Sequence, residues 1–158
     1  MPTGPALDAL IARHGLAPHP EGGFFAEVVR CGAVARSDGA SRAALTAIHY
    51  VLPSGAASRW HRVDADEVWT HVGGDALDLW VMDEDGDGAV HRLGAGGDVL
   101  ALVPSGAWQA ARPGAGAAGY THVVCTVAPG FEFADWHLAA DAPTAVQACL
   151  ERLAPGLL

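Results

Sequence analysis

Short segments in which apolar and polar residues alternate make up most of the chain between about residues 24 and 138. The alternation is clearest in the segment Leu77–Met82, where Leu77, Leu79 and Val81 interleave with three other residues. Successive side chains point to opposite faces of a strand, so this pattern predicts sheets with one buried face. Clusters of glycine, proline and aspartate separate the segments, as is typical of antiparallel sandwiches and barrels. The predicted strands are Phe24–Arg30, Arg42–Leu52, Ala57–Val63, Glu67–Val72, Ala76–Met82, Ala89–Leu93, Asp98–Val103, Trp108–Arg112, Tyr120–Ala128 and Phe131–Leu138.

Both ends of the chain carry apolar residues at helical spacing instead. Leu7, Leu10 and Ile11 predict a helix over residues 5–14, with Pro5 in its first turn and Gly15 after its last. A second apolar face predicts a helix over residues 141–154. The length favours one domain over residues 1–158. We therefore expect an all-β fold, a double-stranded β-helix or jelly-roll barrel over about residues 20–138, with a short helix at each end.

The charge of the chain excludes several function classes. Its formal net charge is −9, and all nine basic residues are arginine. An acidic chain repels a phosphate backbone, so we expect no nucleic-acid partner. The absence of lysine excludes Schiff-base chemistry, including that of pyridoxal phosphate.

Hydrophobicity and cysteine content indicate where the protein works. No apolar run approaches the ~20 residues needed to cross a bilayer, and the N-terminus lacks the features of a secretory signal, so we expect no membrane association. Cys31, Cys125 and Cys149 are odd in number and scattered, which predicts reduced thiols in a cytoplasmic protein.

Two stretches of the chain resemble the paired motifs of the cupin superfamily. The first is G-A-A-S-R-W-H-R-V-D-A-D-E-V-W-T-H-V-G-G, in which His61 and Glu67 stand at metal-ligand positions but Val63 replaces the second histidine. The second is G-D-V-L-A-L-V-P-S-G-A-W-Q, in which Gln109 replaces the last histidine. The motifs therefore indicate a cupin barrel that has lost part of the usual metal site.

Four further segments narrow the resemblance to the small, largely uncharacterised cupin-5 family of RmlC-like jelly rolls. They are H-P-E-G-G-F-F-A-E, H-R-V-D-A-D-E-V-W, P-S-G-A-W-Q-A-A-R and G-Y-T-H-V-V-C-T-V-A-P-G-F-E-F. This resemblance covers about residues 7–138. It implies a barrel that is usually dimeric and contains a small-molecule pocket. Relatives of this shape include nucleotide-sugar epimerases and sugar isomerases.

His61 and Glu67 are the candidate catalytic residues, because a histidine near its ordinary pKa can accept a proton and a carboxylate can orient its ring. Tyr50 or Tyr120 could return the proton, although each also suits a core position. A purely structural pairing of His61 with Glu67 is the alternative. The candidate ligand-binding residues are Glu21, Arg59, Trp69, His71, Gln109 and Tyr120.

Alternation along the strands predicts which of these residues share a face. Arg59 and Val63 should accompany an inward His61, and Trp69 and His71 should accompany an inward Glu67. Trp108 should face away from Gln109. We expect no cofactor. The alternative is one divalent transition metal, whose ligands would be His61, Glu67 and Gln109. If they face the barrel interior, His49, His71 or His122 could replace one of these ligands.

The function expected from these residues is the binding of a small polar metabolite, sugar or nucleotide-like, in the barrel. Epimerisation or isomerisation by acid–base chemistry would use His61 as the base. A metal-dependent dioxygenase or isomerase and a non-catalytic binding protein are the alternatives. We also expect a homodimer, in which Phe24, Phe25 and Val28 supply an apolar strand at a sheet edge.

Overall fold

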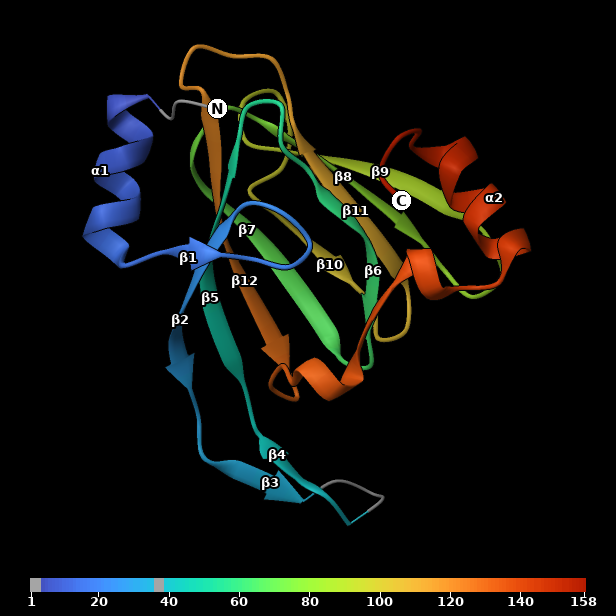
Figure 1. The fold of residues 1–158 in the computed structure, drawn as a ribbon. Helices are drawn as coiled ribbons and strands as arrows, with labels where there is room; N and C mark the ends of the chain where they lie inside the picture. Colours follow the sequence, from blue (N-terminus) through green and yellow to red (C-terminus); the bar gives the residue numbers. More distant parts are fainter. Residues whose placement is uncertain (1–3, 36–38) are drawn as a thin grey trace.

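The computed structural model describes residues 4–35 and 39–158. Two antiparallel sheets face each other and enclose the interior, with one helix on each side of the pair (Figure 1). The predicted all-β jelly roll with two terminal helices is therefore confirmed. Neither helix is long and apolar enough to cross a bilayer in the described part of the chain.

The first sheet has six strands, and its strand order follows the jelly-roll pattern rather than the order in the sequence. In spatial order the strands are β1 (Ala17–Pro18), β2 (Phe24–Arg30), β5 (Thr46–Pro53), β12 (Tyr120–Ala128), β7 (Asp66–Gly74) and β10 (Leu100–Val103).

The second sheet has five strands and covers the other side of the barrel. In spatial order they are β13 (Trp136–Leu138), β6 (Ser58–Val63), β11 (Trp108–Pro113), β8 (Leu77–Met82) and β9 (Gly88–Leu93). A separate ribbon of β3 (Ala33–Ala35) and β4 (Ser41–Ala43) projects from one end of the barrel (Figure 1).

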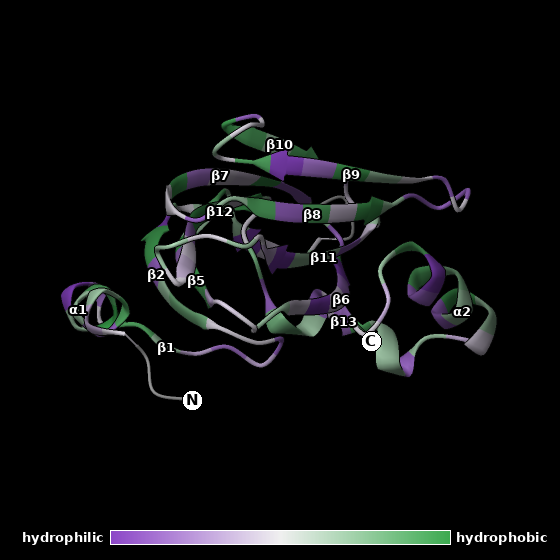
Figure 2. Ribbon diagram, turned by 90° about the horizontal axis from the view of Figure 1, so that it is seen from above, coloured by the Kyte–Doolittle hydropathy of each residue, from purple (hydrophilic) through white to green (hydrophobic). Residues whose placement is uncertain are grey.

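The helices pack on opposite outer faces. Helix α1 (Pro5–His14) lies beside β2 and β5, whereas α2 (Thr144–Leu153) lies by β6, β11 and β13 (Figure 2). Leu7 of α1 packs on Val51 of β5, and Leu150 of α2 packs on the cluster formed by Trp60 and Trp108. Trp108 thus faces away from Gln109, as predicted.

The main core lies between the sheets. Full burial of a large apolar side chain stabilises a fold by roughly 1.5–3 kcal/mol, so this cluster supplies much of the driving force for closing the barrel. Its largest members, all buried, are Tyr50, Leu52, Trp69, Leu77, Leu79, Leu93 and Val103.

Three predicted elements differ from the observed ones by more than two residues or by an interruption. The predicted strand Arg42–Leu52 is interrupted, because the backbone of residues 44 and 45 bonds to residues 31 and 32. The predicted strand Phe131–Leu138 begins with a 3-10 turn over Phe133–Asp135, so only Trp136–Leu138 is extended. The second helix begins at Thr144 rather than at residue 141. Pro143 disfavours helical backbone in the residue before it, Ala142, so the helix does not extend back to residue 141.

Candidate functional site

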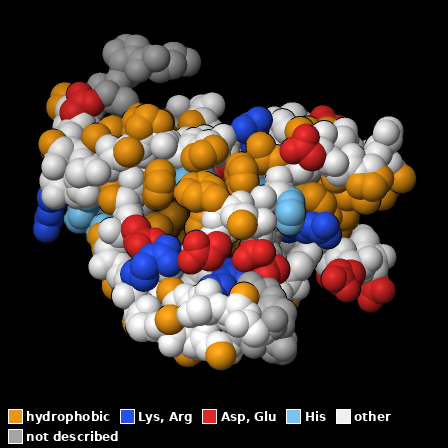
Figure 3. Space-filling model, turned by 60° about the horizontal axis from the view of Figure 1, so that its bottom comes forward, with side chains coloured by type: hydrophobic (Ala, Val, Ile, Leu, Met, Phe, Trp, Pro, Cys, Tyr) orange, Lys and Arg blue, Asp and Glu red, His pale blue; other side chains and the backbone are white. Residues whose placement is uncertain are grey.

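A pocket opens at the end of the barrel from which the β3–β4 ribbon projects. Seen from this end, acidic and basic side chains gather beside exposed hydrophobic ones (Figure 3). The cavity volume is about 100 Å³. Its polar wall consists of His19, Glu21, Thr46, His61, Glu67 and Cys125, its apolar wall of Phe25, Ile48, Val63, Val127, Phe131 and Phe133, and its charged rim of Glu27, Arg30 and Glu132.

The loop before β2 carries Glu21 into the barrel. Gly22 and Gly23, at φ 124° and 70°, adopt backbone conformations that other residues rarely reach. Glu21 is only 5% exposed. Its Oε1 accepts a hydrogen bond from Ser58 Oγ at 3.0 Å, and its Oε2 accepts one from Trp136 Nε1 at 3.3 Å. The tight glycine turn therefore fixes a carboxylate inside the pocket.

This carboxylate contacts the predicted base. Glu21 Oε2 lies 3.2 Å from His61 Nδ1, which also lies 2.7 Å from the carbonyl oxygen of Arg59. A carbonyl oxygen can only accept, so His61 Nδ1 carries the proton and donates it. In the neutral ring, the free lone pair is consequently on Nε2.

Glu67 is held by a buried chain of side chains on the opposite wall. Gln109 Nε2 donates to Glu67 Oε2 at 2.7 Å, and Trp69 Nε1 donates to Gln109 Oε1 at 2.7 Å. Burial raises the pKa of the Glu67 carboxyl, against the lowering influence of His61. Burial also raises the pKa of the neighbouring Cys125 thiol. This wall therefore favours neutral side chains.

His19 is a pocket residue that the sequence analysis missed. Its side chain is 6% exposed, and its Nδ1 accepts a hydrogen bond from the backbone N–H of Glu21 at 3.2 Å. Burial lowers the pKa of His19. The signal that could have found it is its place in the H-P-E-G-G segment, directly before the paired glycines.

Comparison with known proteins identifies the family. The model of the Cupin_5 family, described as "Cupin superfamily (DUF985)", matches residues 8–139. The chain belongs to the Cupin_5 family. No curated protein matches this Cupin_5 chain.

Solved structures agree with this assignment. A hypothetical protein from Leishmania major is 35% identical, with 94% of this chain and 92% of that chain covered and a TM-score of 0.76. A protein from Shewanella oneidensis is 28% identical, with coverages of 92% and 94% and a TM-score of 0.77. Oxalate decarboxylase from Bacillus subtilis, at 16% identity, 89% and 37% coverage and a TM-score of 0.58, shares the fold alone.

Of the six predicted ligand-binding residues of the Cupin_5 protein, Glu21 lines the pocket and the other five lie outside its lining. Arg59 donates to the carbonyl oxygen of Pro20 instead, because β6 has one extra residue between Ser58 and His61 opposite β11, which reverses the alternation. His71 lies 3.0 Å from the carbonyl oxygen of Asp75. Tyr120 packs in the cluster under α1.

The predicted inward direction of Trp69 and Gln109 is correct, but both are buried behind Glu67 rather than on the pocket surface. Val63 lines the pocket, as the alternation predicted. The hydroxyl of Tyr50 donates to the carbonyl oxygen of Gly22 at 2.8 Å, and burial raises its pKa well above the ordinary value. Tyr50 is thus a core residue that supports the loop carrying Glu21.

Two of the histidines considered as substitute metal ligands lie on the outer face of the six-stranded sheet. His49 Nδ1 and His122 Nε2 are 2.9 Å apart, and the ring of His14 at the end of α1 lies 4.1 Å from that of His49. Burial and the neighbouring histidines lower the pKa of His122 to about 4. Neither His49 nor His122 can reach the barrel interior.

The pocket does not fit the metal that the cupin motifs imply. Val63 provides no donor, and the oxygen of Gln109, the atom that would bind a cation, accepts from Trp69. His61 Nδ1 is directed at a carbonyl and a carboxylate. Among residues 4–35 and 39–158, no group of three or more histidine, cysteine, aspartate or glutamate side chains is arranged to hold a metal ion.

Proposed function

We propose that this Cupin_5 protein binds a small, uncharged polar metabolite of the sugar type and epimerises or isomerises it by acid–base chemistry. The observation that carries the proposal is the arrangement around His61. Its Nδ1 proton is held by the Arg59 carbonyl and the Glu21 carboxylate, which leaves the Nε2 lone pair to act as the base.

The chemistry follows from this pairing. His61 takes the proton from a carbon next to a carbonyl group, and the Glu21 carboxylate orients the ring and stabilises the imidazolium that forms. Glu21 takes the orienting role that the sequence analysis gave to Glu67. Glu67 contacts the ligand from the same pocket, and burial raises the pKa of its carboxyl.

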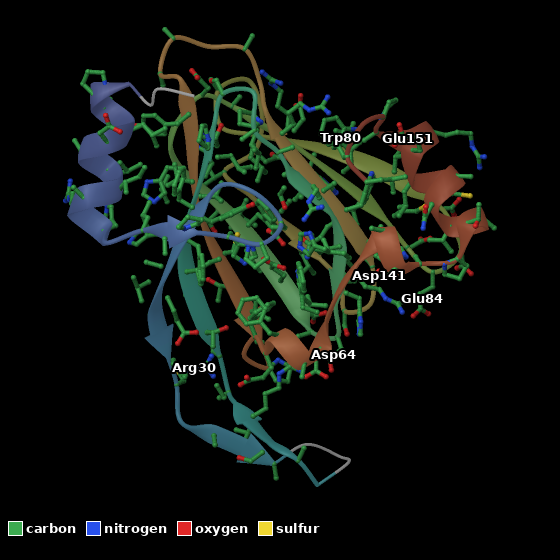
Figure 4. The ribbon with its side chains drawn as sticks, in the orientation of Figure 1. Arg30, Asp64, Trp80, Glu84, Asp141 and Glu151 are labelled. Atoms are coloured by element: carbon green, nitrogen blue, oxygen red, sulfur yellow. The ribbon has the colours of Figure 1, made fainter. Side chains whose placement is uncertain are left out.

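The charge of the rim favours an uncharged ligand over a phosphorylated one. Arg30 is an arginine of the pocket lining, and it lies on β2 at the same end of the barrel as Asp64 (Figure 4). Its Nε and Nη2 donate to Glu27 at 2.8 and 2.9 Å, and its Nη1 donates to Glu132 at 3.0 Å. An anionic group would meet carboxylates, so a neutral sugar suits this rim better than a nucleotide.

The cavity also limits how much of the ligand enters. A volume of about 100 Å³ is smaller than the ~150 Å³ cavities that hold benzene, so it admits roughly four or five non-hydrogen atoms. The reacting carbonyl and its neighbouring carbon fit inside. The rest of the ligand would lie at the mouth against Phe131 and Phe133, whose rings pack edge-to-face at a centroid distance of 5.0 Å.

The proposed assembly is a homodimer. Val28 and Val29 of β2 are 51% and 41% exposed, and within residues 4–35 and 39–158 the two-residue β1 is the only strand on the outer side of β2. Phe24 and Phe25 do not contribute to this surface, because Phe24 packs under α1 and Phe25 lines the pocket. We also propose a cytoplasmic location, which the three free cysteines support.

Deuterium exchange tests the function. The protein is incubated in D₂O with neutral aldoses and ketoses of three to six carbons, and proton NMR follows the loss of the hydrogen next to the carbonyl. We expect exchange with at least one sugar, lost in His61→Asn and strongly reduced in Glu21→Gln. His91→Asn on β9, outside the pocket, is the matched control. If the protein binds a sugar but no hydrogen exchanges, catalysis is refuted and the protein only binds its ligand. If His61→Asn exchanges hydrogen as fast as the wild type, the assignment of His61 as the base is refuted.

A further inference from the structure

Two histidines in one small pocket are held with their ring protons on opposite atoms. His61 carries its proton on Nδ1, which donates to the carbonyl oxygen of Arg59. His19 Nδ1 accepts from the backbone N–H of Glu21, so this nitrogen holds a lone pair and the neutral ring has its proton on Nε2. One ring therefore offers a base and the other a hydrogen-bond donor.

We propose that His19 is the second catalytic residue of the pocket, which donates a hydrogen bond from Nε2 to the carbonyl oxygen of the substrate while His61 removes a proton from the adjacent carbon. This inference rests on the proposed function and assigns recognition of the substrate's carbonyl oxygen to His19. A neutral donor suits a carbonyl oxygen, and it avoids placing a second cation beside the imidazolium of His61.

The loop holds the His19 ring in place for this role. The backbone N–H of His19 donates to the carbonyl oxygen of Gly23, and the His19 carbonyl accepts from Gly22 N–H, each at 3.0 Å. Around the ring, Phe25 packs edge-on at a centroid distance of 4.7 Å and Phe133 stacks at 6.2 Å. Both phenyl rings line the pocket, so His19 lies between its aromatic mouth and Glu21.

The surroundings keep His19 uncharged near neutral pH. Burial lowers its pKa, and His61 lowers it further, while Glu21 acts in the opposite direction. A neutral imidazole is a competent electrophile when its N–H points at a developing oxyanion in a site shielded from water. Burial of both histidine side chains, at 6% and 3% exposure, provides this shielding.

The proposed step balances without a co-reactant. The C–H bond next to the carbonyl breaks, and its proton goes to His61 Nε2. The electron pair of that bond forms a C=C bond, and the carbonyl π pair moves to oxygen, which His19 Nε2–H holds as an enolate. Return of the proton from His61 to the carbon completes the exchange, with a deuteron when the imidazolium has exchanged with D₂O.

The activity test compares two substitutions of His19. His19→Phe keeps an aromatic ring but has no donor, and we expect its exchange rate at saturating sugar to fall about 100-fold or more, the effect of losing one oxyanion donor. His19→Gln retains an N–H and should lose less. The dissociation constant of the sugar, measured by NMR titration, should change less than the rate. His91→Phe is the matched control. An unchanged rate in a folded His19→Phe would overturn the role of His19 while the proposed function stands.

A second measurement does not depend on activity. Two-bond ¹⁵N–¹H NMR spectra of the wild-type protein at pH 7.5 report which nitrogen of each ring is protonated. We expect His19 protonated on Nε2 and His61 on Nδ1. A proton on Nδ1 of His19, or a charged His19 ring, would overturn the inference whether or not a substrate has been found.

Discussion

Replacing Gln109 by leucine tests the buried chain that holds Glu67. Gln109 is 0% exposed and Trp69 1%, so water cannot replace the two 2.7 Å hydrogen bonds that the amide makes. A buried donor or acceptor left without a partner costs about 1–3 kcal/mol. The orphaned indole N–H and the weakened contact to Glu67 together should cost about 2–4 kcal/mol. At roughly 2–4 °C per kcal/mol for a chain of this size, the melting temperature should fall by about 4–16 °C.

Urea unfolding followed by circular dichroism measures this loss, and Gln147→Leu is its matched control. Gln147 also donates two hydrogen bonds, to the carbonyl oxygens of Ala140 and Ala142, but it lies where water can replace them. The control should lose less than about 1 kcal/mol. The double variant Gln109→Leu/Trp69→Phe should recover part of the loss, because it removes the orphaned donor. If Gln109→Leu proves as stable as Gln147→Leu, the reasoning is refuted.

Three further predictions concern His122 on the outer face, Gly22 in the loop before β2, and the buried Arg42. The pKa of His122 is about 4 in the folded protein and 6.5 in the unfolded chain, so the unfolded chain binds the proton first and the stability of the fold should decrease as the pH drops from about 6.5 to about 4. The variant His122→Asn should show a smaller decrease in melting temperature over this pH range, and a profile identical to that of the wild type would contradict the pKa shift. Gly22→Ala should disrupt the turn, because the φ of Gly22 is 124° and an added Cβ would collide with the carbonyl oxygen of Ala57. Calorimetry should show a lower melting temperature for this variant, whereas the control Gly4→Ala, with open space around the added Cβ, should melt like the wild type. Arg42 is 3% exposed and forms an ion pair with Asp64 at 2.6 Å. Urea unfolding of Arg42→Leu should therefore show a free energy of unfolding that is lower by about 2–4 kcal/mol, and a decrease below about 1 kcal/mol would count against a structural role of Arg42.

The sequence predicted the barrel well because strand alternation is a strong local signal. It placed Glu67, Trp69 and Val63 on the inner face, and the structure agrees. It failed at Arg59 because a bulge in β6 adds one residue, and no local pattern announces a bulge whose register is set by pairing with β11.

The loop residues of the site were harder to predict. Glu21 was recognised beside two glycines, but alternation says nothing about a turn, so its contact with His61 could come only from the tertiary structure. His19 was missed for the same reason. The direction of His49 was in principle readable, because its neighbours Ile48 and Tyr50 belong to the inner core and His49 must therefore face outward.

The indole of Trp136 is an intrinsic fluorescent probe beside this pocket. Its N–H donates to Glu21, and its ring centroid lies 6.5 Å from those of both His19 and His61. Indole emission responds to local polarity, and a protonated imidazole at contact quenches it. Excitation of the native protein should therefore record pocket occupancy and histidine charge in the same spectrum. Subtracting the emission of Trp136→Phe isolates that signal, so ligands can be screened by fluorescence without attaching a dye.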